Sequence, residues 1–500
     1  MLCVNPAMID EHDRRLASLV RPPNFRNPSP ASKYDLVVIG GGTAGLVCAA
    51  GAAGLGARVA MVERARLGGD CLNTGCVPSK SMLRSARVVG EARAGPSLGI
   101  RATVQPDFQA VMTRMRGRRA DLAPADSADR LSSLGVDVFF GSGSFSGPRS
   151  MTVSTEEQAP HCSLRFRKAV IATGSRPAVP SIPGLSETPY LTNETVFDLT
   201  EQPRELAIVG GGPTGCELAQ AFARLGTRVT LFESGQQLLA REDRDAARVV
   251  AARLRQDGVD VLLSTELASV QCDGGRILLR HVGGVLSVDA LLVASGRAPR
   301  VNDLQLEAAG IEYSAGGVTV DDRLRTSNRQ VYAAGDVCSK FKFTHAADAM
   351  ARIVVRNALF FGRARVSSLI IPWCTFTSPE VGAVGDFGDE AAARGADAIT
   401  IPLSSVDRSV VDEATEGFVR LHHRRGRIVG ATIVAPDAGE LISAVAVAMR
   451  YGGSLSDLAS SVFPYPTLSV ALRQAGDAYR RSALTPAARN ALRYYFRLLR

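Results

Sequence analysis

The chain has 500 residues and a formal net charge of +9, with 46% hydrophobic and 21% charged residues. This composition excludes a disordered or fibrous chain, and the length exceeds what one hydrophobic core serves, so we expect several domains of an α/β enzyme. No apolar run reaches the length of a membrane span, and the basic residues lack the aromatic-interleaved clusters of nucleic-acid-binding proteins. Cysteines without a regular framework suit a reducing compartment, so we expect a cytoplasmic protein that binds no nucleic acid.

Residues 1–33 are predicted to form a loosely ordered N-terminal arm, because the run RPPNFRNPSP is rich in proline. A nucleotide-binding unit follows, with an apolar strand, a turn with Gly40, Gly42 and Gly45, a helix, and a second strand that ends at Glu63. In such a unit the glycines permit a tight turn and close approach of a pyrophosphate, which binds at the helix N-terminus. The acid at the strand end binds an adenosine ribose. We therefore predict a dinucleotide site at these four residues.

Two cysteines, Cys71 and Cys76, follow that turn in the run GGDCLNTGCVPSK. A dithiol beside a flavin can accept two electrons as a disulfide and hand them on through a nucleophilic thiolate. The alternative is a pair of buried structural cysteines. We favour the redox interpretation because the pair lies directly downstream of a nucleotide-binding turn.

The nucleotide-binding pattern recurs 170 positions later, with Gly210, Gly212, Gly215 and Glu233 in the places of the first set. One such fingerprint is weak evidence, but two in register, each with its acid, are strong. The acid at the second strand end favours NADH, because it would repel the 2′-phosphate of NADPH. Two dinucleotide sites and a dithiol in one chain indicate electron flow from NAD(P)H through FAD to the thiols.

The run from Cys71 to Lys80, the duplicated fingerprints and the run PWCTFTSPEVG from Pro372 resemble the class I pyridine nucleotide-disulfide oxidoreductase family, in its dihydrolipoyl dehydrogenase and mercuric reductase-like branch. The resemblance implies an α/β fold of two Rossmann-like domains, which bind FAD and NAD(P), followed by an α+β dimerisation domain, in a homodimer. The expected boundaries are residues 34–183 and 296–366 for the FAD domain, 184–295 for the NAD(P) domain, 367–485 for the dimerisation domain and 486–500 for a basic amphipathic tail.

The same resemblance assigns roles to individual residues. Cys76 would face the flavin as the charge-transfer thiolate, and Cys71 would be the interchange thiol that attacks the acceptor. Lys80 would lie near flavin N5 and pair with Glu217. Further FAD contacts are expected near the adenine end, at the crossover between domains and at the ribityl chain, from Gly143, Thr173, Gly174, Gly296 and Asp336. The alternative for Gly143 is a glycine that merely turns a hairpin.

The sequence departs from the family's disulfide reductases at the base for the interchange thiol. Those enzymes carry His-Pro-Thr and then a glutamate near the C-terminus, whereas this chain has Tyr465 in place of the histidine and Val470 in place of the glutamate. Tyrosine, with a pKa near 10, is a poor general base at neutral pH. Tyr465 resembles mercuric reductase, but no cysteine follows Cys374 and there is no N-terminal Cys-x-x-Cys domain. The acceptor therefore stays open between a quinone, a metal ion and a protein partner, and no resident metal site is predicted.

Two further alternatives follow from this departure. One is a diaphorase-type NADH:quinone reductase, in which the flavin and not Cys71 passes electrons out. The other is a redox-sensing flavoprotein subunit without turnover. The tail, with Leu492, Tyr495, Phe496 and Leu499 at helical spacing among arginines, would either contact the cytoplasmic face of a membrane or pack on its own domain, and we favour packing.

Overall fold

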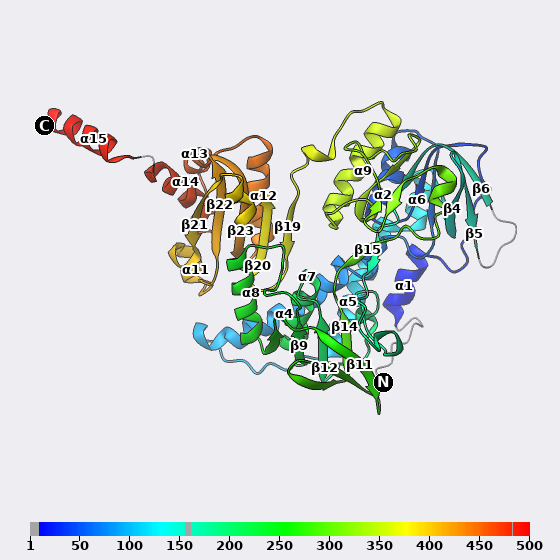
Figure 1. Ribbon diagram of the computed structural model, residues 1–500, viewed down its shortest axis with the longest axis horizontal. Helices are drawn as coiled ribbons and strands as arrows, with labels where there is room; N and C mark the ends of the chain where they lie inside the picture. Colours follow the sequence, from blue (N-terminus) through cyan, green and yellow to red (C-terminus); the bar gives the residue numbers. More distant parts are fainter. Residues whose placement is uncertain (1–9, 156–161, 483) are drawn as a thin grey trace. The chain divides into compact units, whose positions relative to one another are not determined.

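The computed structural model describes residues 10–155, 162–482 and 484–500 (Figure 1). The chain divides into two compact units, Met1–Phe232 with Thr265–Leu369 and Glu233–Ser264 with Ile370–Arg500, and each is described by itself. Both contain mixed α/β structure, which confirms the predicted fold class. The domain boundaries expected from the sequence stay predictions.

The helices of the first unit are α1 (Glu11–Val20), α2 (Thr43–Gly54), α3 (Gly69–Asn73), α4 (Cys76–Ala94), α5 (Phe108–Leu122), α6 (Ala128–Ser133), α7 (Pro213–Arg224) and α9 (Thr344–Leu359). Its strands are β1 (Tyr34–Ile39), β2 (Val59–Glu63), β3 (Val136–Phe140), β4 (Ser142–Gly147), β5 (Ser150–Ser154), β6 (Cys162–Ile171), β7 (Ser175–Pro177), β8 (Glu205–Val209), β9 (Arg228–Phe232), β11 (Leu267–Asp273), β12 (Arg276–His281), β13 (Gly284–Val288), β14 (Ala290–Val293), β15 (Arg297–Pro299), β16 (Tyr313–Ser314), β17 (Gly317–Val318) and β18 (Val331–Ala333). The second unit contains α8 (Arg244–Gln256), α10 (Gly388–Ala393), α11 (Asp407–Val411), α12 (Ala438–Arg450), α13 (Leu455–Ser460), α14 (Val470–Ser482), α15 (Pro486–Leu498), β10 (Val259–Leu262), β19 (Pro372–Thr375), β20 (Glu380–Gly385), β21 (Asp397–Pro402), β22 (Phe418–Arg424) and β23 (Arg427–Ala435).

The main sheet of the first unit has the strand order β3-β2-β1-β6-β5-β4, and β18 also pairs with β6. Strands β3, β2, β1, β6 and β18 are parallel, whereas β4 and β5 add an antiparallel edge. Helix α2 packs against β1 and β2 and lies beside α9 (Figure 1). The parallel strands are buried on both faces, so their sequences are continuous apolar runs such as LVVI in β1. The carboxyl ends of β1 and β2 carry the first predicted nucleotide site.

The second nucleotide-binding pattern gives another parallel arrangement, in which β8 pairs with both β9 and β14. Helix α7 connects β8 to β9 and packs on both of them. The sheet β11-β12-β13 is antiparallel. The two crossover segments, β7 and β15, pair with each other in antiparallel fashion. The duplication seen in the sequence is therefore also a duplication of strand, turn, helix and strand.

The N-terminal segment differs from the expectation of a loosely ordered arm. Residues 11–20 form α1, whose N-cap Asp10 accepts hydrogen bonds from the backbone N–H groups of His12 and Asp13. Leu16 and Val20 are 1% and 0% exposed, because α1 packs against α5. A capped helix with an apolar stripe therefore precedes the proline-rich run. The expectation of loose order was wrong for this stretch.

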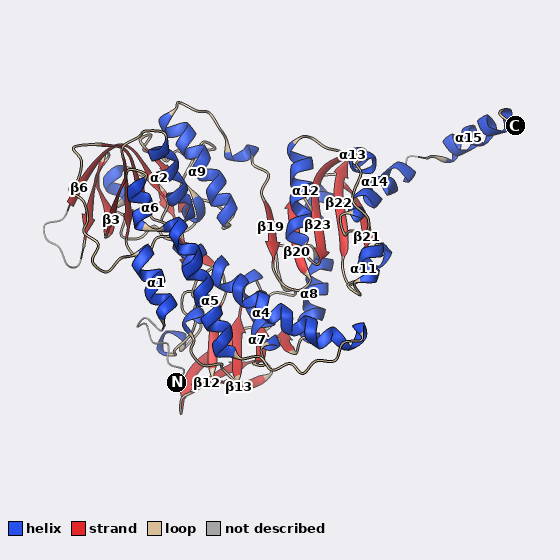
Figure 2. Ribbon diagram, turned by 180° about the vertical axis from the view of Figure 1, so that it is seen from behind, coloured by secondary structure: helices blue, strands red, loops and turns tan. Residues whose placement is uncertain are grey.

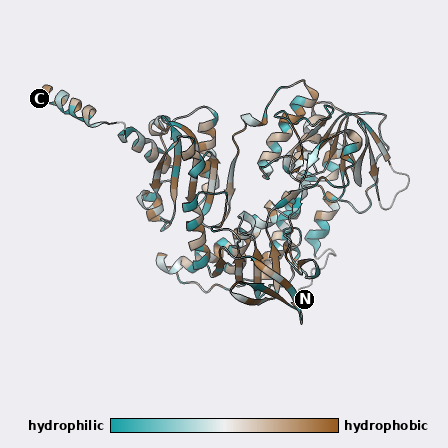
Figure 3. Ribbon diagram, in the orientation of Figure 1, coloured by the Kyte–Doolittle hydropathy of each residue, from teal (hydrophilic) through white to brown (hydrophobic). Residues whose placement is uncertain are grey.

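The second unit is built on the antiparallel sheet β19-β20-β23-β22-β21, with α12 packed across β20 and β23 (Figure 2). Within the same unit Arg420 forms ion pairs with Asp243 and Asp245. The tail is helical as its periodicity predicted, and apolar and polar residues alternate along α15 (Figure 3). No residue of α15 is buried, so the favoured expectation that it packs on its own domain was wrong. In the described parts of the chain, no helix combines the length and the apolar character needed to cross a bilayer.

Candidate functional site

The first glycine turn has no room for side chains. Gly40 has φ +104°, and a Cβ there would lie 2.4 Å from the carbonyl oxygen of Ala172. A Cβ on Gly45 would lie 1.8 Å from the carbonyl oxygen of Gly40, so α2 approaches the end of β1 as only a glycine allows. Gly42 is the N-cap of α2 and provides no side-chain cap. The first N–H groups of α2 are therefore left for another acceptor.

Glu63 lies at the carboxyl end of β2 with 9% of its surface exposed. Its two carboxylate oxygens accept hydrogen bonds of 2.6 Å from the backbone N–H groups of Gly41 and Ala65. Burial raises the pKa of Glu63, although both backbone hydrogen bonds lower it. A side-chain-free turn after β1, an uncapped helix N-terminus and a fixed carboxylate at the end of the adjacent strand β2 fit the adenosine diphosphate half of FAD.

The second turn repeats this geometry closely. Gly210 has φ +108°, and a Cβ on Gly215 would lie 1.9 Å from its carbonyl oxygen. Gly212 is the N-cap of α7, again without a side-chain cap. Glu233 belongs to the other compact unit, where its Oε1 accepts a 2.6 Å hydrogen bond from the N–H of Gly235. The turn fits the pyrophosphate of a nicotinamide dinucleotide.

Cys71 and Cys76 lie on two consecutive helices that meet at a tight loop. Cys71 is in α3 and half-buried, whereas Cys76 is exposed and is the first residue of α4. Gly75 separates the helices, and a Cβ there would come within 2.7 Å of the carbonyl oxygen of Asp70. The thiol at the N-terminus of α4 is favoured as a thiolate by the positive end of the helix dipole.

The two thiols are hydrogen-bonded to each other and are not equivalent. That hydrogen bond lowers the pKa of Cys76 to about 6, against the opposing effect of burial, and the Thr344 hydroxyl and Lys80 lower it further. The same hydrogen bond and burial raise the pKa of Cys71 well above its ordinary value. Cys76 Sγ lies 3.3 Å from Thr344 Oγ1 at the start of α9. At neutral pH the pair is therefore a Cys76 thiolate that accepts a hydrogen bond from the Cys71 thiol.

Lys80 and Glu217 form an ion pair between α4 and α7. Lys80 Nζ lies 2.8 Å from Glu217 Oε2, and the Glu217 side chain is only 6% exposed. A carboxylate so deeply buried is stable when a cation compensates it. Lys80 also lowers the pKa of Cys76 and Glu217 raises it, so the ion pair and the dithiol act on one another.

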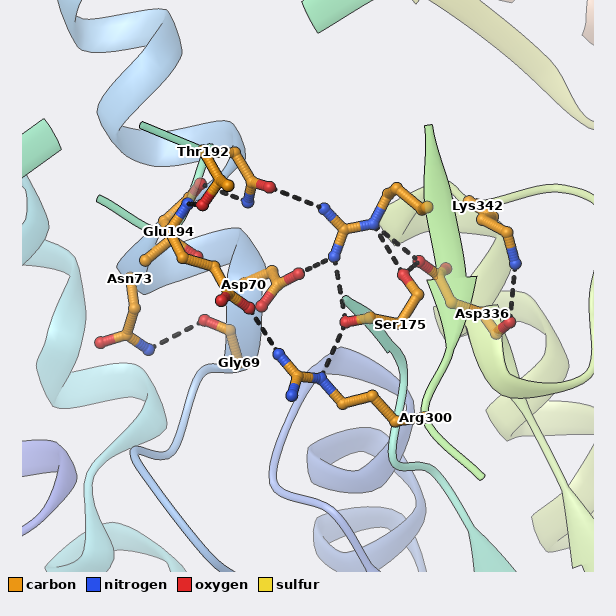
Figure 4. A network of polar contacts seen from close by, with 12 residues as sticks. Gly69, Asp70, Asn73, Ser175, Thr192, Glu194, Arg300, Asp336 and Lys342 are labelled. Carbon is orange, nitrogen blue, oxygen red and sulfur yellow. Dashed lines mark hydrogen bonds and ion pairs between the residues drawn. The ribbon is translucent and has the colours of Figure 1, made fainter. Parts of the chain in front are cut away.

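A polar network joins the crossover strands to the dithiol segment, with Asp70, Ser175 and Asp336 close together (Figure 4), and Arg297 contacts all three of them. Its guanidinium donates to Ser175 Oγ at 2.6 Å and forms an ion pair with Asp70, which immediately precedes Cys71. Ser175 Oγ in turn donates to Asp336 Oδ2 at 2.5 Å. Asp336, the predicted ribityl-binding acid, is thereby connected through two side chains to the residue before Cys71.

Three of the remaining predicted FAD contacts lie at the same crossover, and the fourth, Gly143, lies in β4. Thr173 Oγ1 donates to the carbonyl oxygen of Arg300 at 2.7 Å, and Gly174 has φ +69°. Gly296, with φ +121°, immediately precedes β15. Gly143 lies inside β4, where a Cβ would come within 2.8 Å of Met151 Cε. It therefore packs within a strand and does not turn a hairpin.

Tyr465 is 71% exposed in the second unit, and its hydroxyl donates to Asp407 Oδ2 at 2.9 Å. The hydrogen bond and charge of Asp407 raise the pKa of Tyr465 above its ordinary value. The tyrosine thus remains a neutral hydrogen-bond donor at neutral pH.

Three residues near the dithiol were missed from the sequence: Asp70, Arg297 and Thr344. Arg297 and Asp70 stand inside motifs that were otherwise noted, directly beside Gly296 and Cys71. Thr344 opens α9, and its contact with Cys76 joins positions 268 residues apart. A helix start after FKF was the only local signal for it.

Comparison with known proteins gives two family matches. The pyridine nucleotide-disulphide oxidoreductase model matches residues 34–351, and the dimerisation domain of the same family matches residues 371–475. The second match supports assembly as a homodimer.

Similar proteins cover most of the chain. A mercuric reductase from Acidithiobacillus ferrooxidans is 37% identical over 90% of this chain and 83% of its own length. A mercuric reductase from Streptomyces lividans is 35% identical over 89% of this chain and 96% of its own. Among solved structures, the Cu(II) complex of the HOCl-induced flavoprotein disulfide reductase RclA from Escherichia coli superposes with a TM-score of 0.80 at 30% identity, covering 90% of this chain and 100% of that one. LpdA from Mycobacterium tuberculosis superposes with a TM-score of 0.79 at 29% identity, covering 90% and 100%.

Proposed function

This chain belongs to the pyridine nucleotide-disulphide oxidoreductase family and is an FAD-dependent oxidoreductase that uses NAD(P)H, and from that premise we propose that its acceptor is a thiophilic metal ion bound by Cys71 and Cys76. The observation that carries the proposal is the asymmetry of the two thiols, with the pKa of Cys76 lowered to about 6. A thiolate at neutral pH is the form that binds a soft metal ion. For a mercuric ion the balance is NADH + Hg²⁺ → NAD⁺ + H⁺ + Hg⁰.

Bound FAD supplies the two-electron chemistry that connects a nicotinamide to a dithiol. The chain's own residues provide the binding and the charges. Gly40, Gly42, Gly45 and Glu63 hold the adenosine diphosphate half of the cofactor, and Asp336 holds the ribityl chain. The ion pair of Lys80 and Glu217 keeps a cation beside the Cys76 thiolate, and Cys71 offers the second sulfur to the metal.

A metal acceptor also agrees with the substitution at the position of the family's general base. Reduction of a small disulfide needs a base for the interchange thiol, and Tyr465 has a raised pKa and donates to Asp407. A metal ion held between two sulfurs accepts electrons without a proton relay. The names of the relatives, mercuric reductases and a copper complex of a disulfide reductase, are consistent with this class of acceptor.

The proposal is tested by NADH oxidation under anaerobic conditions with four separate acceptors: mercuric chloride in excess cysteine, cupric chloride, menadione and lipoamide. The matched variants are Cys71→Ser and Cys272→Ser, the latter an exposed cysteine in β11 far from the dithiol in sequence. We expect metal-dependent oxidation that disappears in Cys71→Ser and persists in Cys272→Ser. Menadione reduction that survives Cys71→Ser, without metal turnover, would favour the diaphorase alternative. Reduction of the bound flavin by NADH with no acceptor turnover would favour the redox-sensing subunit.

NADH is proposed as the preferred reductant because the acid at the end of β9 is Glu233. A carboxylate there binds the ribose hydroxyls and repels a 2′-phosphate. Two unit charges about 4 Å apart repel by roughly 4 kcal/mol in a partly solvated site, so even a weakened effect favours NADH by tenfold or more. The ratio of kcat/KM for NADH and NADPH measures this preference, and Glu233→Gln should reduce it.

We further propose that the tail places the protein on an anionic membrane surface. Arg489, Arg493, Arg497 and Arg500 recur every three or four residues along the tail, and no acidic residue follows Asp477. Tyr495, Phe496 and Leu499 are more than half exposed, so an apolar face is available beside the cations. Four arginines near an anionic surface contribute about 4 kcal/mol, most of it lost at high salt. Flotation with phosphatidylglycerol vesicles should carry the full chain at low salt only and should not carry a chain ending at residue 485. Equal flotation of the two chains would contradict the proposal.

A further inference from the structure

The N-terminal segment lies outside the region matched by the family model, which begins at residue 34. Helix α1 nevertheless packs on α5 in the same compact unit (Figure 1). Its apolar stripe explains that packing, but its charged face makes contacts that packing does not require. Those contacts lead to the dithiol segment.

Two buried arginines on α5 receive the acidic side chains of the N-terminal segment. Arg119 is 2% exposed and Arg116 is 4% exposed. Arg119 lies 2.8 Å from Asp13 Oδ1, and Arg116 lies within 3.6 Å of both Asp10 and Asp13. Burial lowers the pKa of Arg119 while Asp13 and Asp198 raise it, as expected for a cation kept charged by its neighbours.

The other terminal nitrogen of the Arg119 guanidinium contacts the segment between the two cysteines. Its Nη1 donates to the carbonyl oxygen of Asn73 at 2.9 Å. Asn73 is 6% exposed, and its side-chain amide donates to the carbonyl oxygens of Leu67 at 3.0 Å and Gly69 at 2.8 Å. Arg119 therefore connects Asp13 to the residue midway between Cys71 and Cys76.

Backbone contacts make a second connection from the N-terminal segment to the same region. The N–H of Leu67 donates to the carbonyl oxygen of Val20 at 3.0 Å, and Arg21 donates to the carbonyl oxygen of Ala65 at 2.8 Å. The segment from residue 65 to the end of α3 is thus held by hydrogen bonds at residues 65, 67 and 73. A planar guanidinium with donors in a fixed fork suits a link between a carboxylate and a carbonyl oxygen.

We propose that Asp13 and Arg119 are positioning residues for the redox-active pair, because Asp13 orients the guanidinium that holds the Asn73 carbonyl and so sets the distance between Cys71 and Cys76. The inference rests on the proposed function, since it takes the dithiol to be the redox centre. Only four residues separate the two cysteines, so displacement of Asn73 changes how readily the two sulfurs reach the geometry of a disulfide.

The test compares Asp13→Asn, which removes the charge at nearly constant shape, with Arg119→Lys, which keeps a buried cation but loses the fork. Asp121→Asn is the matched control, because Asp121 on α5 forms an exposed 3.0 Å ion pair with Arg15 on α1. The flavin-containing full-length protein is equilibrated anaerobically in glutathione redox buffers, and the fraction with the Cys71–Cys76 disulfide closed is quantified by alkylation and peptide mass spectrometry. Long-wavelength absorbance during anaerobic NADH titration and the thermal midpoint are measured on the same samples.

We expect both test variants to lower the equilibrium constant for closing the disulfide by about threefold or more, and to weaken the long-wavelength band. Asp121→Asn should match the wild type in both readouts. If Asp13→Asn does not fold, Arg119→Lys alone decides the question. Folded variants that lose thermal stability but close the disulfide as readily as the wild type would overturn the inference and leave Asp13 a structural residue. A wild-type protein without the long-wavelength band would instead refute the proposed function.

Discussion

A single methyl group in the first glycine turn should remove FAD from the protein, whereas the same methyl group nine residues later in the same helix should not. Gly45 and Gly54 both lie in α2. A Cβ on Gly45 would lie 1.8 Å from the carbonyl oxygen of Gly40, but a Cβ on Gly54 meets nothing within 4 Å. An ordinary contact needs about 3.5 Å, so Gly45→Ala must separate α2 from β1 by more than about 1.5 Å.

That displacement acts on the helix N-terminus that would bind the pyrophosphate. Overpacking of a tight contact costs about 3 kcal/mol or more, which is over a hundredfold in FAD affinity. Gly54→Ala should cost nothing and gain up to about 1 kcal/mol, because alanine is the better helix former. The assay is the ratio of FAD to protein after purification, from the visible and ultraviolet absorbance, with the fluorescence of released FAD as a second measure. We expect a colourless Gly45→Ala and a yellow Gly54→Ala. A Gly45→Ala protein that keeps one FAD per chain would refute the steric argument.

Three further predictions follow from the same geometry. Gly215→Ala should keep FAD but lower kcat/KM for NADH about a hundredfold, because a Cβ there would lie 1.9 Å from a carbonyl oxygen of the second turn. Steady-state kinetics at unchanged flavin content measure this loss, and unaltered kinetics would contradict the prediction. In the reduced wild type, labelling of Cys76 by iodoacetamide should be half-maximal near pH 6 and increase with pH as the thiolate forms, while Cys71 should react far more slowly. Labelling of Cys76 that begins only near pH 8.5 would show that Cys76 is an ordinary thiol. Burial raises the pKa of Glu242 to about 7, although the 2.6 Å hydrogen bond from Trp373 lowers it, so the carboxyl group is protonated below pH 7 and ionised above it. The fluorescence emission of Trp373, the chain's single tryptophan, should therefore change with a midpoint near pH 7. In Glu242→Gln the emission should not depend on pH in this range.

Through Arg297 the crossover also connects the segment that carries the dithiol to Asp336. Asp70, Ser175 and Asp336 come from three separate parts of the chain, and all of them contact this one guanidinium. Burial lowers the pKa of Arg297, and the carboxylate of Asp336 opposes that effect. The acid expected at the ribityl chain, Asp336, and the acid next to Cys71, Asp70, therefore share a cation.

The glycine turns could be recognised from the sequence because their requirement is local. A positive φ at Gly40 and the absence of a Cβ at Gly45 are demands that one residue type meets, so spacing alone reveals them. The dithiol, with α4 beginning at Cys76, is likewise contained within a few consecutive residues. The ion pair of Lys80 with Glu217 was anticipated only through resemblance to a family, since 137 positions separate the two.

Tertiary structure alone decided the rest. The helix α1 is short, and its order depends on Leu16 and Val20, which are buried against α5, and on Asp13, whose partner Arg119 lies 106 positions away. The surroundings of the Cys76 thiol likewise depend on Thr344, which lies 268 positions away in the sequence with its hydroxyl oxygen 3.3 Å from the sulfur. Backbone requirements act between neighbouring residues and leave a pattern in the sequence. Burial and the charges that compensate it exist only once distant segments have packed, and no local pattern records which segments those are.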